Sequence, residues 1–82
     1  MKTTRELIAE ELRALRAKSK LSLEDVADIS KLSKDTICRY ENNQVSMQID
    51  NLEKIIQAYD KDFSIFITQI YANKHKNKEQ ED

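Results

Sequence analysis

The chain has 82 residues, of which 39% are apolar, enough for one small domain. Its 14 Lys and Arg and 15 Asp and Glu give a net charge of −1, without the basic excess typical of nucleic-acid-binding proteins. A single cysteine excludes an intramolecular disulfide. The absence of glycine excludes Gly-rich phosphate loops, and no apolar run is long enough to predict a membrane span. We therefore expect a cytoplasmic protein with no membrane partner.

The first predicted helix covers about Thr4 to Lys18. Thr3 and Glu6 have the spacing of a capping box, in which each residue bonds the backbone of the other. Apolar residues recur on one face at helical spacing, namely Ile8, Leu12 and Leu15. Glu6, Glu10 and Glu11 lie towards the start of this segment and basic residues crowd its end, an order that complements the helix dipole; the basic residues are Arg13, Arg16, Lys18 and Lys20.

Two short helices follow, at about Leu23 to Ser30 and about Lys34 to Asn42. Ser22 and Ser33 precede them, and a serine hydroxyl at this position accepts a hydrogen bond from the backbone of the first turn. Two capped helices joined by a short turn form a helix-turn-helix, in which the second helix usually enters the DNA major groove.

Two further helices are predicted at about Ile49 to Tyr59 and at about Phe63 to Ala72, with Asp62 as the N-cap of the last. Asn43 is expected to adopt the left-handed conformation that ends a helix. Residues 73–82, NKHKNKEQED, lack large apolar side chains and predict a charged, disordered tail. The sequence thus predicts an all-α fold with one domain at residues 1–72.

The segment LRALRAKSKLSLEDVADISKLSKDTICRYEN, followed by IDNLEKIIQAY, resembles the Cro/lambda-repressor-like helix-turn-helix family, also called the XRE family. The similarity covers most of the chain. It implies a five-helix lambda-repressor-like bundle, with the helix-turn-helix at helices 2 and 3, that binds double-stranded operator DNA. The implied function is a sequence-specific transcriptional regulator of repressor or controller type, acting as a homodimer on a palindromic site.

An alternative remains open, a protein-interaction module of the same fold, antitoxin-like or anti-repressor-like, with weak or no DNA binding. Two features favour it: Leu23 replaces the glutamine that is common in the family at the start of helix 2, and the net charge is acidic. No paired-carboxylate, nucleophile–base or metal constellation suggests an enzyme, and no cofactor or small-molecule ligand is expected.

The resemblance assigns base contacts to the outward face of the third helix: Lys34, Asp35, Thr36, Cys38 and Arg39. Arg39 can bind guanine O6 and N7 through two hydrogen bonds. Asp35 either accepts from cytosine N4 or only complements the helix dipole, and Lys34 meets either a base or a phosphate. Cys38 is either a thiol switch beside the groove or an unremarkable small residue.

Phosphate contacts are expected at the starts of the second and third helices and in the loop after the third: Ser22, Leu23, Ser33, Asn42, Asn43 and Gln44. The resemblance also implies a structural ion pair between Arg16 and Glu41, although Arg16 could instead contact a phosphate. In the turn, Lys31 occupies a position where the family commonly has a glycine with positive φ.

The fifth predicted helix has more apolar surface than a small bundle easily covers. Ile65, Ile70 and Tyr71 are the expected contacts between two copies of the chain. His75 lies among lysines, so we expect it to bind no metal.

Overall fold

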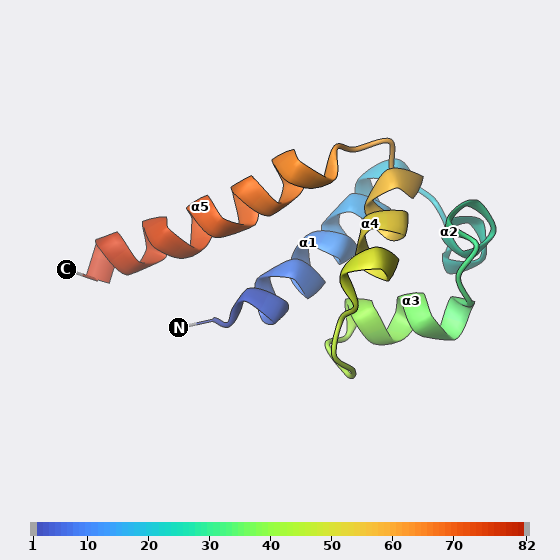
Figure 1. The fold of residues 1–82 in the computed structure, drawn as a ribbon, viewed down its shortest axis with the longest axis horizontal. Coiled ribbons are helices and arrows are strands. Elements are labelled where there is room, and N and C mark those ends of the chain that lie inside the picture. The colour runs from blue at the N-terminus through green and yellow to red at the C-terminus, as the bar shows by residue number, and fades with distance from the viewer. Residues whose placement is uncertain (1, 82) are drawn as a thin grey trace.

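The computed structural model describes the backbone of residues 2–81 and the side chains of residues 2–75. The described residues form five helices and no strand, as shown in Figure 1: α1 (Thr4–Ser19), α2 (Leu23–Ser30), α3 (Lys34–Glu41), α4 (Ile49–Ala58) and α5 (Phe63–Glu81). The all-α prediction is confirmed. Each helix begins where the sequence predicts, and the first four end within one residue of the predicted position.

Side chains next to the first turn fix the starts of four helices. Thr3 and Glu6 form the predicted capping box of α1, and Ser22 and Asp25 form an equivalent box at α2. The Ser33 hydroxyl accepts from the backbone N–H of Thr36 at 3.1 Å. At the start of α5, Asp62 Oδ1 accepts from the backbone N–H groups of Ser64 and Ile65. The predicted caps are therefore present.

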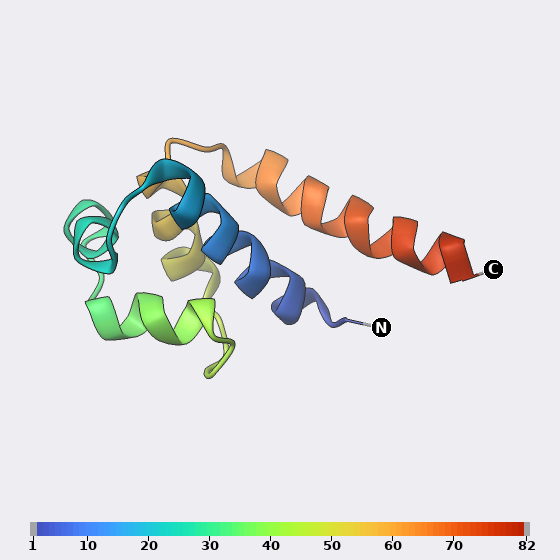
Figure 2. The same cartoon turned by 180° about the vertical axis from the view of Figure 1, so that it is seen from behind.

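The hydrophobic core joins all five helices. Its most buried large side chains are Leu12, Val26, Ile37, Ile55 and Ile56, each at most 1% exposed. α5 adds Phe66 and Ile70. Burial of one such side chain stabilises the fold by about 1.5–3 kcal/mol, so helices too short to persist alone are held by packing. α1 contacts both α3 and α5, which lie on opposite sides of the bundle in both views (Figures 1 and 2).

The chain turns at residues with positive φ although it has no glycine. These residues are Lys20, Lys31, Asn43 and Asp60, with φ between 55° and 66°. A side chain with a Cβ costs about 1–2 kcal/mol in this conformation. Lys31 therefore keeps the left-handed turn between α2 and α3 at some cost, and its backbone N–H caps α2 by donating to the Ala27 carbonyl at 2.9 Å.

The predicted end of the last helix is wrong, because α5 continues past Ala72 to Glu81. Low apolar content suggested disorder, but this segment has no glycine or proline to stop a helix, and Lys, Gln and Glu are good helix formers. Lys74 Nζ also donates to Thr4 Oγ1 at 2.9 Å, which ties α5 to the start of α1. The tail predicted at residues 73–82 lies partly outside the described residues, and the domain limit at residue 72 stays a prediction.

Candidate nucleic-acid interface

α3 packs through one face and presents the other to solvent. Ile37 and Tyr40 anchor it in the core, at 0% and 3% exposure. On the remaining surface Lys34, Asp35 and Arg39 are exposed, while two further predicted base-contacting residues, Thr36 and Cys38, are half-buried. The structure therefore places all five on the one helix, three of them exposed to solvent.

Both basic side chains of α3 are paired with acids. Arg39 Nε lies 3.0 Å from Asp35 Oδ2 within the helix, and Lys34 Nζ lies 3.5 Å from Glu24 Oε1 on α2. All four side chains are more than half exposed, so in water each pair contributes little to the stability of the fold. The spacing of Asp35 and Arg39, four residues apart on a helix, was a signal for their pair, whereas the contact with Glu24 depends on how α2 and α3 pack.

The serines predicted to contact phosphates act as caps in the structure. The Ser22 hydroxyl accepts from the Asp25 N–H at 3.0 Å, and Ser33 Oγ lies 2.8 Å from Thr36 Oγ1. Both serines are exposed at helix starts, where backbone N–H groups and the helix dipole favour an anion. Leu23, also predicted to contact a phosphate, has a half-buried side chain that packs against the core.

The loop after α3 has one inward-facing and two outward-facing predicted residues. Asn42 and Gln44 are exposed. The Asn42 amide donates to the Cys38 carbonyl at 2.9 Å and to Cys38 Sγ at 3.4 Å. Asn43 has the predicted left-handed backbone, but its Oδ1 is buried and has no partner among the described residues. That oxygen is thus turned away from any ligand on the surface.

A buried tyrosine holds this loop in place. The Tyr40 hydroxyl accepts from the backbone N–H of Gln48 at 2.9 Å and from Asn51 Nδ2 at 3.4 Å. The sequence analysis missed this role of Tyr40, because its partners lie eight and eleven residues further along the chain. The contact fixes the path from α3 to α4 and therefore the position of Asn42 and Gln44.

The end of α3 is tied to α1 by two arginines. Arg16 Nε and Nη2 donate to the two carboxylate oxygens of Glu41, at 2.7 and 3.1 Å, so the implied ion pair is present. Arg13 donates to the Glu41 backbone carbonyl, a contact that sequence reasoning missed. Hydrogen bonding to the carboxylate of Glu41 raises the pKa of Arg16. Because its guanidinium is bound to Glu41 in this way, Arg16 holds α3 against α1 and does not point to a phosphate.

Comparison with known protein families identifies the domain. Residues 12–66 match a family model described as helix-turn-helix, which covers more than half of the chain. The chain belongs to the XRE-type helix-turn-helix family. This helix-turn-helix protein is therefore Cro/lambda-repressor-like, and its domain is that of a DNA-binding regulator. Comparisons with curated proteins and with solved structures gave no match.

The described residues of this helix-turn-helix protein contain neither a metal-binding cluster nor a membrane-spanning helix. No group of three or more His, Cys, Asp or Glu side chains there could hold a metal ion. None of the described helices combines the length and the apolar character that crossing a membrane requires. The family is one of DNA-binding domains, so α3 and the residues around it are the candidate DNA-binding surface.

Proposed function

We propose that the protein is a sequence-specific transcriptional regulator, of repressor or controller type, that binds a palindromic operator as a homodimer in the cytoplasm. The observation that carries the proposal is the exposed face of α3, where Lys34 and Arg39 project from a helix fixed by Ile37, Tyr40 and Glu41. A short recognition helix needs such a rigid support, because the base edges must be met by donors already in place.

Within this proposal, Arg39 binds guanine O6 and N7, and Lys34 contacts a base or a phosphate near the start of α3. Thr36 and Cys38 are half-buried and contribute at most an edge of the side chain to the groove. The backbone at Ser22 and Ser33, with the side chains of Asn42 and Gln44, meets phosphates on either side. Phosphate contacts fix the register, and the base contacts supply the specificity.

The homodimer is proposed to form through α5. Ile65 and Tyr71 are 58% and 61% exposed, a large apolar surface for a small domain. Ile70, expected at the same interface, is 3% exposed inside the core, so that expectation is wrong; it belongs to the face that α5 turns to the bundle. Because α5 and α3 lie on opposite sides of the bundle (Figures 1 and 2), a second copy on α5 leaves α3 free for DNA.

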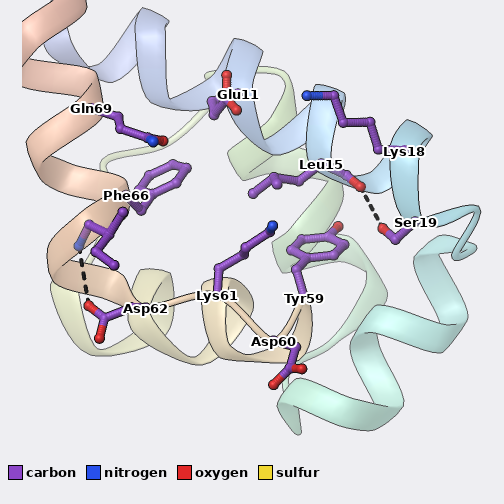
Figure 3. Close-up of a pocket in the computed structure, with 11 residues that line it drawn as sticks. Glu11, Leu15, Lys18, Ser19, Tyr59, Asp60, Lys61, Asp62, Phe66 and Gln69 are labelled. Carbon is purple, nitrogen blue, oxygen red and sulfur yellow. Dashed lines mark hydrogen bonds between the residues drawn. The ribbon is translucent and has the colours of Figure 1, made fainter.

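A groove beside Ile65 supports the choice of a second copy as the partner (Figure 3). It lies between α1, the α4–α5 turn and α5, and has a volume of about 740 Å³. Leu15, Tyr59 and Phe66 give it an apolar lining. Its charged residues have both signs: Glu11, Lys18, Asp60, Lys61 and Asp62. A two-fold axis would bring this surface against its own copy, so that opposite charges can meet.

Selection of bound duplexes from a random pool tests the proposal. The wild type is expected to enrich a palindrome with guanine in each half-site, and its affinity must fall as salt rises. Arg39→Ala is the matched variant, since it removes one exposed side chain of α3 and should lose the preference for that guanine. If wild-type protein enriches no sequence, specific DNA binding is refuted.

A second candidate is a protein-interaction module of the same fold. The acidic partners of both cations on α3 favour it, because Glu24 and Asp35 reduce the positive potential that attracts DNA. If the protein binds neither random nor selected duplexes at low ionic strength, where binding to DNA should be strongest, this function is favoured over DNA reading.

A further inference from the structure

The pair between Asp35 and Arg39 suggests how α3 obtains its base preference. We propose that Asp35 is a positioning residue that orients the Arg39 guanidinium for guanine and so makes the preference of α3 for that base sharper. The inference rests on the proposed function, because it concerns the way in which the same helix reads DNA.

The geometry of the pair leaves the right donors available. Arg39 Nε lies 3.0 Å from Asp35 Oδ2, one helical turn away. A guanidinium has one N–H on Nε and two on each terminal nitrogen, all in one plane. When the carboxylate holds the Nε edge, the terminal nitrogens remain free to meet O6 and N7 of guanine. An arginine held at one edge also loses less conformational freedom on binding.

The same pair penalises wrong contacts. Asp35 is 72% exposed on the outward face of α3, so its carboxylate enters the negative potential of DNA with the helix. If Arg39 turns away to bind a phosphate or another base, this carboxylate is left without its cation beside other acceptors. Guanine is the base that accepts two hydrogen bonds while Arg39 keeps its contact with Asp35. Specificity of this kind comes from a cost on the competing states.

Glu24 and Lys34 form a natural control for this effect. Their pair places a second carboxylate, 76% exposed, near the start of α3, with Nζ and Oε1 3.5 Å apart. A lysine ammonium is a compact charge with rotatable donors, so an acid beside it does not fix a direction as it does for a planar guanidinium. Loss of Glu24 should therefore change the charge near DNA without changing which base is preferred.

The test compares Asp35→Asn with Glu24→Gln, which remove the same charge from neighbouring exposed positions. Relative affinities for the four bases are measured at every half-site position, together with affinity for a random duplex at several salt concentrations. Asp35→Asn is expected to reduce the guanine preference at one position by about 3- to 10-fold. This is only part of the discrimination that a complete bidentate contact with guanine supplies. Glu24→Gln is expected to raise binding to all sequences equally and to leave the base preferences unchanged.

The double variant Asp35→Asn with Arg39→Ala decides whether Asp35 acts through Arg39. Base preference in the double variant should equal that of Arg39→Ala alone. Wild-type preference in Asp35→Asn, with helical content unchanged by circular dichroism, would overturn the inference while leaving the proposed function intact. A loss of preference beyond that of Arg39→Ala would overturn it also, since Asp35 would then read a base itself. Absence of any sequence selection by the wild type would remove the proposed function, and the inference with it.

Discussion

Arg16 on α1 and Glu41 at the end of α3 form an ion pair with two parallel contacts, Nε to Oε2 at 2.7 Å and Nη2 to Oε1 at 3.1 Å. Glu41 is 4% exposed, so its carboxylate has given up nearly all contact with water. The geometry compensates for that loss because a planar guanidinium matches a carboxylate at both oxygens. This contact helps to set the orientation of α3 relative to the rest of the bundle.

Replacement of Glu41 by glutamine should strongly destabilise the domain. Arg16 would keep its charge in a partly buried site without the carboxylate. Breaking one side of a fully buried pair costs about 3–5 kcal/mol, and because the Arg16 side chain is 32% exposed, the cost here should lie near or below the lower end of that range. Each 1 kcal/mol corresponds to roughly 4–8 °C in Tm for a domain of this size. Urea and thermal unfolding measure both quantities.

The control is Glu10→Gln, which removes an acid of α1 whose side chain is 42% exposed and pairs with Lys2 at the surface. Its cost should be within about 1 kcal/mol, as for other exposed pairs. Substitution of both Arg16 and Glu41 by Met and Leu should destabilise less than Glu41→Gln, because no charge is then left unpaired. A double variant less stable than the single one would contradict this account.

Tyr59 offers the opposite case, a buried hydroxyl with no hydrogen-bond partner among the described residues. Tyr59→Phe should leave stability at neutral pH unchanged or slightly raised. Tyr40→Phe is the matched control, and it should cost about 1 kcal/mol because the Tyr40 hydroxyl accepts from Gln48 and Asn51. Equal destabilisation by both variants would show that the Tyr59 hydroxyl has a partner, for example ordered water.

The same hydroxyl should affect stability in alkali. Burial raises the pKa of Tyr59 to about 12 from an ordinary value of 10.0, so the folded state favours the protonated phenol. Its contribution is complete below the unfolded pKa and is lost as pH rises from about 10 towards 12. Unfolding midpoints in this window should fall less in Tyr59→Phe than in the wild type.

Asp62 should make the start of α5 sensitive to acid. Hydrogen bonds from the Ser64 hydroxyl and from the backbone N–H groups of Ile65 and Ser64 lower the pKa of Asp62. The stabilisation is therefore present above the unfolded pKa and is lost as pH falls through the folded one. Asp62→Asn keeps a good N-cap but does not titrate. Its stability should depend less on pH below the ordinary aspartate pKa of 3.8 than that of the wild type, and NMR titration of the Asp62 carboxyl checks the direction of the shift.

Local sequence signals were sufficient to predict most of the helix boundaries and the faces of the helices that form the core. Thr3, Ser22, Ser33 and Asp62 marked helix starts because a cap involves residues only two or three positions away. The helical spacing of apolar residues gave the faces that form the core. The end of α5 was missed because a charged segment without glycine or proline can be a helix or a coil, and composition alone does not distinguish them.

The site was predictable where residues lie on one helix and unpredictable where helices meet. The outward residues of α3 follow from its period. The hydrogen bond of Arg13 to the Glu41 carbonyl, the pair of Lys34 with Glu24 and the anchoring of Gln48 depend on packing angles that no local spacing encodes. Ile70 is a different case, because its spacing of four residues from Phe66 puts both side chains on one face of α5, and that face packs against the bundle.

The proposed dimer predicts a specific effect of charge on α5. Ile65→Asp should shift the protein from dimer to monomer in sedimentation at micromolar concentration, because an apolar contact would be replaced by a carboxylate that must lose water. Ile29→Asp is the control, since Ile29 is similarly exposed, at 54% against 58%, but lies on α2. An effect of both substitutions, or a wild type that is monomeric, would refute the interface on α5.

Lys34 and Arg39 should have separable effects on DNA binding, although both are exposed cations on one helix. Arg39→Ala should cost about 1–3 kcal/mol on the preferred operator and relax the preference at one position, as loss of a bidentate guanine contact does. If Lys34 meets a phosphate, Lys34→Ala should weaken binding to all sequences. It should also make the negative slope of log affinity against log salt shallower by about 1 per half-site. Binding isotherms on the selected site and on a random duplex, each at four salt concentrations, distinguish the two. A change of base preference in Lys34→Ala would instead assign Lys34 to a base, and a uniform loss in Arg39→Ala would remove the guanine contact from the proposal.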